Sequence, residues 1–257
     1  MDIDELRRLY DTYERRGANY PRFRREESET VVRMIALDEG EHCTVIFSSL
    51  NEVNADAAIE GELEYFARIG RRFEWKLFSH DDPPDLKARL EARGFSIGED
   101  EAIMALDLAA LPPDLAKEHS QDVRKVVDEA GRREFALASK AAWEDQPDDW
   151  IESILKTLRE SPSRMSAWLA YADGKPACAA RIDFPEGSHF ASLWGGATLE
   201  PFRKRGLYTA VLAARAKEAI ARGYRYLTID ASPMSRPIAE RLGFSLLSIS
   251  NPCDSPR

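Results

Sequence analysis

The chain has 257 residues, and its 36 Lys and Arg against 45 Asp and Glu give a formal net charge of −9. A hydrophobic content of 44%, with five Trp, is enough to build real cores and excludes a wholly disordered chain. The fourteen Gly and fourteen Pro show no period, which excludes a collagen-like fibre. The acidic balance argues against a general nucleic-acid binder, which needs a basic surface. The length fits one large domain or two small ones.

The cysteines and histidines give no sign of a stapled or metal-bound fold. Cys43, Cys178 and Cys253 form no close pair, and the four His have no ligand-like spacing. The first residues are charged and lack the apolar stretch of a signal peptide, and no run of eighteen apolar residues occurs. We therefore predict a cytoplasmic protein that uses no metal and does not bind a membrane.

Hydrophobic periodicity and turn residues predict the elements of the first half. In chain order they are a helix over 2–16, strands over 30–37 and 43–47, a helix over 54–69, a strand over 73–78, a helix over 84–91 and a strand over 103–108. The two Pro in the segment 111–114 break this pattern. The sequence thus predicts a boundary between a domain of residues 1–113 and one of residues 114–257.

The second half repeats the rhythm. The predicted elements are a strand over 123–127, helices over 132–143 and 150–159, strands over 165–172, 175–184 and 189–199, a helix over 206–222, a strand over 225–231, a helix over 236–242 and a strand over 244–250. Asp173-Gly174 is the strongest hairpin signal in the chain. The residues after Asn251 are predicted to form a loose tail.

The two halves also share a local pattern. Residues 70–95 and 223–244 each run through a strand, a turn, a short helix and a Gly-Phe pair, and a strand follows. A Gly-Phe pair after a helix is a common ending, so chance similarity is the alternative. The matching order of the preceding hairpin and long helix favours a duplicated α/β architecture.

The most informative segment follows the predicted strand 189–199. Three consecutive cations, Arg203, Lys204 and Arg205, precede Gly206, at which a helix begins. A helix N-terminus offers unpaired N–H groups and the positive end of the helix dipole, and glycine lets a ligand approach the backbone. These features predict a phosphate or pyrophosphate site. The alternative is a solvated basic turn.

This segment resembles the acyl-CoA signature of the GNAT superfamily of N-acetyltransferases, Arg/Gln-x-x-Gly-x-Gly/Ala. Arg203-x-x-Gly206 fits, whereas Tyr208 stands where the family has Gly or Ala, and Pro201 is displaced by one position. The order of elements over residues 123–249 is also similar. The resemblance implies an α/β fold with a mixed sheet and two tandem GNAT-like domains.

The resemblance also implies a set of cofactor-binding residues, with acetyl-CoA as the co-substrate. Backbone groups at the strand end would bind the pantetheine arm, and the loop and helix start would wrap the pyrophosphate. The implied residues are Ala197, Thr198, Leu199, Arg203, Lys204, Arg205, Gly206, Leu207, Tyr208 and Thr209. An amine would attack the thioester directly, and coenzyme A would leave as a thiolate.

Two departures from the family concern the catalytic groups. Ala239 stands where the family often has a Tyr that protonates the leaving thiolate, and Ser232 stands where it often has an Asn. Asp230 and Tyr208 are the nearest candidates for catalytic roles. The alternatives are a cap or salt-bridge partner for Asp230 and core packing for Tyr208.

The first half lacks the signature. Its matching strand-to-helix junction, residues 48–54, has no cation and no glycine and carries Glu52, which would repel a pyrophosphate. We therefore interpret residues 1–113 as a GNAT-like domain that has lost cofactor binding.

An acidic loop is the candidate acceptor site, because it lies where the family usually builds one. Its four carboxylates, flanked by Trp143 and Trp150, would suit a cationic amine. They are Glu144, Asp145, Asp148 and Asp149. The alternative is a solvated acidic loop beside two core residues.

Together these features predict acetyl transfer from acetyl-CoA to a primary amine of a small molecule, peptide or protein. The alternatives are a non-catalytic acyl-CoA sensor and, less consistent with the acidic total, acyl transfer from aminoacyl-tRNA. Residues 196–245 carry nine Lys and Arg and four Asp and Glu, a net charge of +5, so the remaining 207 residues carry −14. An acidic protein with a cationic, cofactor-sized segment fits an anionic co-substrate.

Overall fold

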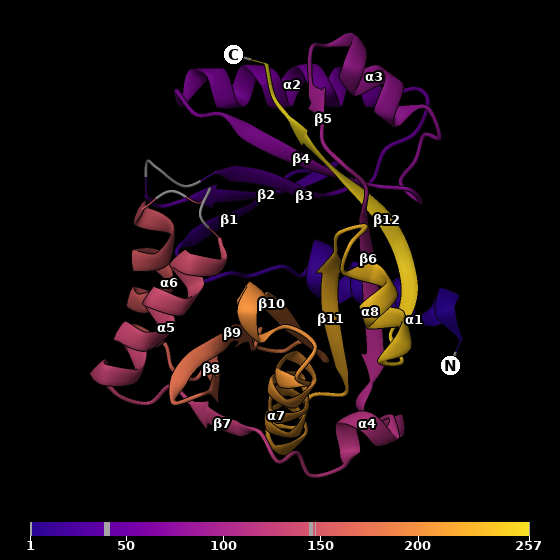
Figure 1. Cartoon of the computed structure of the whole chain (residues 1–257). Helices are drawn as coiled ribbons and strands as arrows, with labels where there is room; N and C mark the ends of the chain where they lie inside the picture. Colours follow the sequence, from indigo (N-terminus) through magenta and orange to yellow (C-terminus); the bar gives the residue numbers. More distant parts are fainter. Residues whose placement is uncertain (1, 39–41, 144–145, 147, 257) are drawn as a thin grey trace. The chain divides into compact units, whose positions relative to one another are not determined.

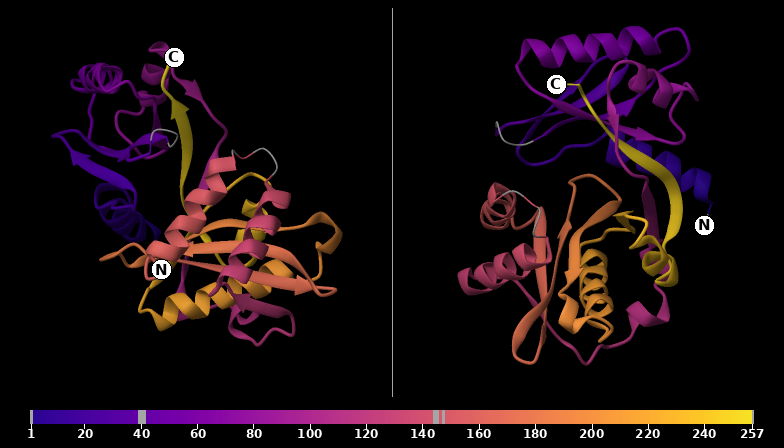
Figure 2. Two further views of the ribbon diagram at one scale, coloured as in Figure 1. Left: turned by 90° about the vertical axis from the view of Figure 1, so that its left-hand side faces the viewer. Right: turned by 45° about the horizontal axis from the view of Figure 1, so that its top comes forward.

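The computed structural model describes residues 2–38, 42–143, 146 and 148–256, with only the backbone at 148 and 149 (Figures 1 and 2). It divides into two compact units, each of mixed α/β structure. Unit 1 comprises Met1–Met104, Ala231–Pro237 and Leu246–Arg257, and unit 2 comprises Ala105–Asp230 and Ile238–Ser245. The end of the chain thus belongs to unit 1. The domain boundary at residue 113 stays a prediction.

Unit 1 contains a mixed sheet in the order β1-β2-β3-β4-β12, in which only β3 and β4 run parallel. The short β5 pairs with β12, and β6 (Glu101–Asp107) passes from unit 1 into unit 2. The other elements are α1 (Ile3–Tyr10), the π-helix η1 (Asp11–Arg16), β1 (Phe23–Glu27), β2 (Val31–Ala36), β3 (Cys43–Ser48), α2 (Ala55–Arg68), β4 (Phe73–Phe78), α3 (Leu86–Ala92), β5 (Ser96–Ile97) and β12 (Ser245–Asp254).

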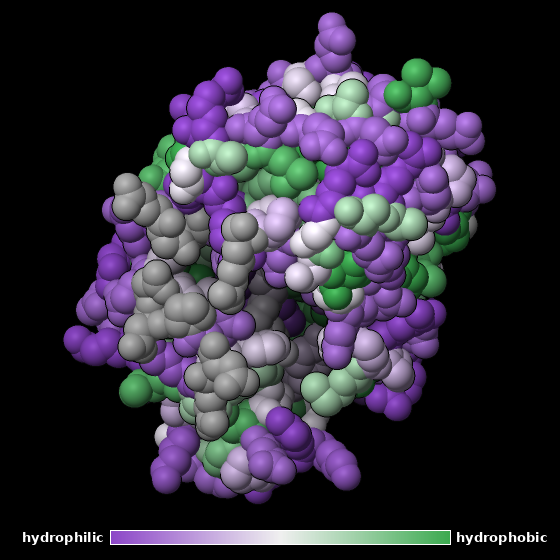
Figure 3. All heavy atoms as spheres, turned by 90° about the horizontal axis from the view of Figure 1, so that it is seen from above, coloured by the Kyte–Doolittle hydropathy of each residue, from purple (hydrophilic) through white to green (hydrophobic). Residues whose placement is uncertain are grey.

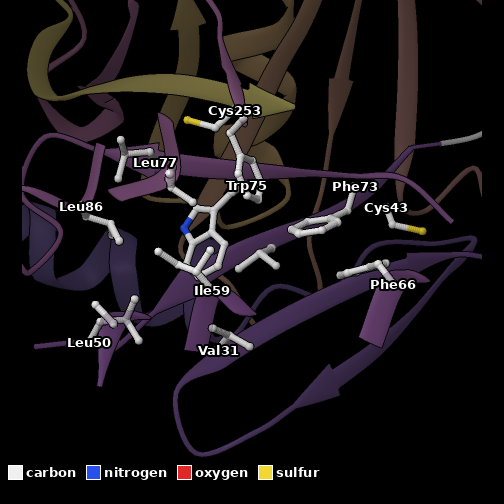
Figure 4. Close-up of a cluster of buried hydrophobic side chains, with 14 of the residues drawn as sticks. Val31, Cys43, Leu50, Ile59, Phe66, Phe73, Trp75, Leu77, Leu86 and Cys253 are labelled. Atoms are coloured by element: carbon white, nitrogen blue, oxygen red, sulfur yellow. The ribbon is translucent and has the colours of Figure 1, made fainter. Parts of the chain in front are cut away.

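The core of unit 1 forms where alternate residues of β4 face the helices (Figure 4). Trp75 is 1% exposed, and Phe73 stacks on Phe66 of α2 with ring centroids 4.1 Å apart. Cys253 of β12 is fully buried in the same cluster. Burial of an aromatic or aliphatic side chain contributes about 1.5–3 kcal/mol, so this cluster is the main source of unit 1 stability.

Several predictions for unit 1 are confirmed, and three are wrong. The strands at 30–37, 43–47 and 73–78 and the helix at 54–69 are present, although β1 and β5 were not predicted. The helix predicted over 2–16 is α-helical only to Tyr10 and continues as η1, and α3 begins at Leu86 rather than at residue 84. The predicted loose tail is also wrong, because β12 extends to Asp254 and pairs with β4.

Unit 2 contains a sheet in the order β11-β10-β9-β8-β7, in which β10 and β11 run parallel and the other pairs antiparallel. Asp173 (φ 54°) and Gly174 (φ 73°) form the β8–β9 turn, which confirms the predicted hairpin. The elements are η2 (Leu108–Ala110), α4 (Pro113–Ala116), β7 (Asp122–Lys125), α5 (Glu129–Ala142), α6 (Asp148–Glu160), β8 (Met165–Ala172), β9 (Lys175–Asp183), β10 (Phe190–Thr198), η3 (Glu200–Phe202), α7 (Leu207–Ala221), β11 (Tyr226–Ala231) and α8 (Arg236–Arg241), of which β11 and α8 extend into unit 1.

Successive side chains of β8 and β9 point to opposite faces of this sheet, and helices cover both faces (Figure 1). Ala170, Cys178 and Ala180 pack with Leu207 and Val211 of α7. On the other face, Leu169 and Ala179 pack with residues of α5 and α6 such as Phe135 and Ile151. The helix that begins at Gly206 is therefore fixed against the strands that precede it.

Glu218 anchors the C-terminal half of α7 to the sheet. Its carboxylate accepts hydrogen bonds from Ser166 Oγ (2.8 Å) and Trp168 Nε1 (2.8 Å) of β8, and forms ion pairs with Lys125 and Arg222. Burial alone would raise the pKa of Glu218, but the hydrogen bonds from Lys125, Ser166 and Arg222 outweigh it and lower the pKa. The ionised carboxylate therefore stabilises the folded state.

We expect Glu218→Gln to lower the free energy of unfolding at neutral pH by about 2 kcal/mol, because it weakens several charged hydrogen bonds at once. The folded pKa lies below the unfolded one. The stabilisation that ionised Glu218 provides is therefore present above the pKa of Glu218 in the unfolded chain, and it is lost as the pH falls through the pKa of Glu218 in the folded chain. Urea unfolding at a series of pH values measures both effects. Glu186→Gln is the control, since Glu186 is exposed and pairs only with Arg164 in the described part of the chain. Equal losses in the two variants would contradict the prediction.

The surface is mostly hydrophilic on the face shown in Figure 3, with hydrophobic atoms in scattered groups. Within the described ranges, no helix is both long and apolar enough to cross a membrane.

Candidate functional site

The strands β10 and β11 are paired over only part of their length. The parallel register runs from Phe190 opposite Tyr226 to Leu193 opposite Ile229, whereas β10 continues to Thr198. The register of β10 with β9 shifts between Trp194 and Ala197. Gly195 lies inside this bulge at φ 58°, in the left-handed region that glycine adopts most readily. Beyond Leu193, the edge of β10 that faces away from β9 is therefore not in register with β11.

The peptide groups of the three predicted strand residues point in two directions. The N–H of Leu199 donates to the carbonyl of Ala177 (2.9 Å) of β9, and by alternation the N–H of Ala197 also faces β9. The peptide groups of Thr198 therefore face the other edge. Of the predicted set, Thr198 is the residue best placed to bond an extended ligand backbone there.

The basic loop between β10 and α7 turns sharply. Lys204 (φ 64°) and Gly206 (φ 77°) both have left-handed backbone conformations. Arg203 Nε donates to the Thr198 carbonyl (3.3 Å), and Arg205 pairs with Asp173 (3.0 Å) at the hairpin turn. These contacts hold two of the three predicted cations beside the end of β10.

The N-terminus of α7 lacks a cap. Its N-cap residue is Gly206, which has no side chain to accept a hydrogen bond, and the first intrahelical bond runs from the N–H of Ala210 to the Gly206 carbonyl. The N–H groups of Leu207, Tyr208 and Thr209 precede that bond and have no acceptor within the helix. Three such donors beside three cations can bind a phosphate or pyrophosphate group. The φ of 77° favours glycine at position 206, because any other side chain would be strained there.

Tyr208, the residue that departs from the family signature, lies against the bulge. A Cβ placed on Gly196 would be 3.0 Å from Tyr208 Cε2 and 3.5 Å from Arg215 Nη2. The structure thus brings a predicted catalytic candidate, the glycine of the bulge and a buried arginine together. Tyr208 is half-buried.

Asp183 is a carboxylate that sequence reasoning missed. It lies at the end of β9, opposite Ser192 of β10, and Ser192 precedes Gly195 by three residues. The Oδ1 atom of Asp183 is buried and has no hydrogen-bond partner. Burial raises the pKa of Asp183 to about 6, and Arg181, 3.7 Å away, only partly opposes this. A carboxylate with this pKa can accept a proton near neutral pH.

The other residues predicted for catalysis and acceptor binding lie in β11, in α8 and in the segment 144–149. Asp230 lies in β11 directly after the last residue paired with β10, and Ala239 is buried in α8. Glu144 and Asp145, and the side chains of Asp148 and Asp149, lie outside the described residues, so the acidic acceptor site stays a prediction. In the first half, Asn51 and Asn54 occupy the junction before α2, and each side-chain oxygen accepts a hydrogen bond from the other residue's backbone N–H. Arg89 of α3 donates to the Glu52 carbonyl (3.4 Å) at the same junction.

Two sequence signals pointed to the missed residues. A Gly-Gly pair inside a strand pattern indicates a bulge or a close backbone approach. Arg215 follows Tyr208 by seven residues on a helix rich in Ala and Leu, which places both on one face. Asp183 gave no comparable signal, because its burial depends on how the strands pack.

The second half of the chain matches a known family. Residues 133–244 match the model described as the acetyltransferase (GNAT) family, which covers the basic loop and α7. The sequence of this segment is therefore similar to that family. A comparison with curated protein sequences gives no match.

Solved structures extend the similarity to both halves. A GCN5-related N-acetyltransferase from Kribbella flavida is 17% identical, with a TM-score of 0.70 over 91% of this chain and 90% of that one. A functionally unknown conserved protein from Staphylococcus epidermidis is 13% identical, with a TM-score of 0.67 over 92% and 95%. A tandem GNAT protein from the clavulanic acid biosynthesis pathway is 15% identical, with a TM-score of 0.61 over 92% and 84%. At these identities the likeness shows the fold, which confirms the predicted fold class.

Proposed function

We propose that the protein transfers an acetyl group from acetyl-CoA to a primary amine of a small molecule, peptide or protein. One observation carries the proposal: an uncapped helix N-terminus, preceded by three cations, comes soon after a strand whose parallel pairing with β11 ends at Leu193. The first feature suits a pyrophosphate, and the second suits an extended pantetheine arm. The match of residues 133–244 to the acetyltransferase (GNAT) family model supports the same assignment.

In this proposal the thioester lies at the bulge of β10. The amine nitrogen attacks the thioester carbonyl carbon, and N–H groups of β10 stabilise the oxyanion. The C–S bond then breaks and the thiolate takes up a proton. Much of the acceleration comes from holding amine and thioester in attack geometry.

The acceptor class rests on the sequence alone. The four carboxylates between residues 144 and 149 favour a cationic amine, by charge and by the flanking Trp143 and Trp150. We propose this loop as one wall of the acceptor site.

Release of free thiol from acetyl-CoA, measured across a panel of small amines, polyamines and peptides, tests the proposal. Turnover with at least one amine, together with an increase in melting temperature on adding acetyl-CoA, is the expected result. Binding without turnover on any amine would favour an acyl-CoA sensor instead, a reading that the alanine at position 239 supports. Absence of binding would contradict both.

Asp183 is the carboxylate that we propose accepts the amine proton, directly or through water. The rate constant kcat/KM should therefore rise with pH through an acid limb near 6, and Asp183→Asn should remove that limb and lower kcat/KM by about 100-fold. Because the folded pKa is raised, stability is lost as the pH rises from the unfolded pKa through 6, so Asp183→Asn should also be more stable at pH 8. An unchanged acid limb would remove Asp183 from this role.

A further inference from the structure

Arg215 is a buried charge without a counter-charge. It is 1% exposed, and only its Nη1 is bonded, to the Arg181 carbonyl at 3.0 Å. Its Nε and Nη2 have no hydrogen-bond partner, and none of the described carboxylates forms an ion pair with it. Burial lowers the pKa of Arg215, and the neighbouring Tyr208 and Cys178 side chains oppose this.

Arg15 of unit 1 is as buried as Arg215, and it serves as a comparison because its charge is paired. It is also 1% exposed, but it pairs with Asp81 (2.7 Å) and Asp11 (2.8 Å). An unpaired buried charge is costly, and a hydrophobic side chain of similar volume would be more stable at such a position. The position of Arg215 under the β10 bulge therefore calls for an explanation other than stability.

The helix directs the arginine toward Tyr208. The two residues are separated by two turns on one face of α7, and long side chains on a helix lean toward its N-terminus. Nη2 and the Tyr208 ring both lie beside Gly196. The guanidinium and the phenol ring thus both lie beside the bulge, on the side of the sheet that packs against α7.

We propose that Arg215 is a positioning residue that holds Tyr208 and stabilises its phenolate when the phenol protonates the thiolate of coenzyme A. The proposal rests on the proposed function. As the C–S bond breaks, the sulfur takes the proton from Tyr208 Oη. The phenolate then recovers a proton from the solvent, and the proton that the amine loses on acylation passes to Asp183, which later releases it to the solvent. The pair thus supplies the acid that is missing at Ala239.

The burial of Arg215 favours a role in positioning Tyr208 over a direct contact between Arg215 and the substrate. Nε and Nη2 are inaccessible, so a carboxylate carried on the acyl chain would reach them only if Tyr208 or Gly196 moved. A transient charge on Tyr208 needs no such movement. Dicarboxylic acyl donors are therefore an outcome of the test rather than the proposal.

A double-mutant cycle on the full-length protein tests the proposal. Tyr208→Phe should lower kcat by about 100-fold and Arg215→Met by about tenfold, with the dissociation constant of coenzyme A changed by less than about twofold. In the Tyr208→Phe background, Arg215→Met should have almost no further effect on kcat. Arg215→Lys should retain most of the activity, and Arg215→Met should raise the melting temperature. Arg222→Met, on the same helix but paired with Glu218, is the control and should leave kcat unchanged.

Additive losses in the double variant would overturn the proposal, as would an unchanged kcat in Arg215→Met. The proposal would also be overturned if the protein turned over succinyl-CoA faster than acetyl-CoA and Arg215→Met abolished that preference. Arg215 would then contact the acyl group directly.

If no amine is acylated, the proposed function fails. Ionisation of Tyr208, followed by phenolate absorbance against Tyr208→Phe, then decides the pairing. It should occur at higher pH in Arg215→Met, and equal midpoints would overturn the pairing. The guanidinium faces Tyr208 on α7 and Cys178 on β9, and it also lies beside Gly196 and the Arg181 carbonyl, so Cys178→Ala serves as the matched control.

Discussion

Arg203→Glu is expected to abolish the increase in melting temperature that acetyl-CoA produces, and to weaken binding by about 100-fold. Arg203 is exposed, and the bond from its Nε to the Thr198 carbonyl aims it beside the N-terminus of α7. Charged hydrogen bonds to phosphate contribute about 1.5–3 kcal/mol each, and a carboxylate at the same place adds repulsion. Because every 1.4 kcal/mol is tenfold in affinity, a change of about 3 kcal/mol corresponds to about 100-fold.

Isothermal titration of coenzyme A into the variant measures this loss. Arg24→Glu is the matched control, because it makes the same charge reversal on β1 of unit 1 at a side chain that is 59% exposed. Binding by the native chain should weaken with salt, since surface charges are screened over about 8 Å at physiological ionic strength. If Arg24→Glu weakened binding as much as Arg203→Glu, overall charge rather than a site in the loop would explain the effect.

Local chemistry made the basic loop predictable. Three cations and a glycine between a strand and a helix are contiguous in sequence, and the structure places them at one helix end as expected. The sequence indicates a bulge at Gly196 and a shared helix face for Tyr208 and Arg215, but it does not predict that the two meet, because the strand residue that meets a helix face depends on how α7 packs on the sheet. The burial of Asp183 likewise depends on three adjacent strands.

Some elements of the fold also follow from local sequence, whereas others depend on distant partners. Strands with alternating apolar residues, such as β3 and β4, and the hairpin at Asp173 follow from local pattern. β1 has the sequence FRREE, which carries almost no apolar pattern, and ion pairs such as Arg24–Glu26 and Arg25–Glu27 accompany its pairing with β2. The end of β12 is polar and contains a proline, yet its partner β4 is more than 170 residues earlier in the chain. No local signal encodes such a pairing.

A chain that ends at Asn251 is therefore expected to lose most of its stability, by about 4 kcal/mol or more, because buried side chains and ladder hydrogen bonds are removed together. Residues 252–254 pair with Lys76, Trp75 and Glu74, and Cys253 is fully buried. Ser255 exchanges hydrogen bonds with Phe73, whose N–H donates to the Ser255 Oγ (3.1 Å) and whose carbonyl accepts from the Ser255 N–H (2.9 Å). Urea unfolding of the shortened chain, beside a control that ends at Ser255, measures the loss. Since typical domains are stable by only about 5–15 kcal/mol, the shorter chain should unfold at a far lower urea concentration, whereas the control should remain close to the native chain. Equal midpoints for all three would mean that the residues after Asn251 are a loose tail after all, and that β4 does not need its partner strand.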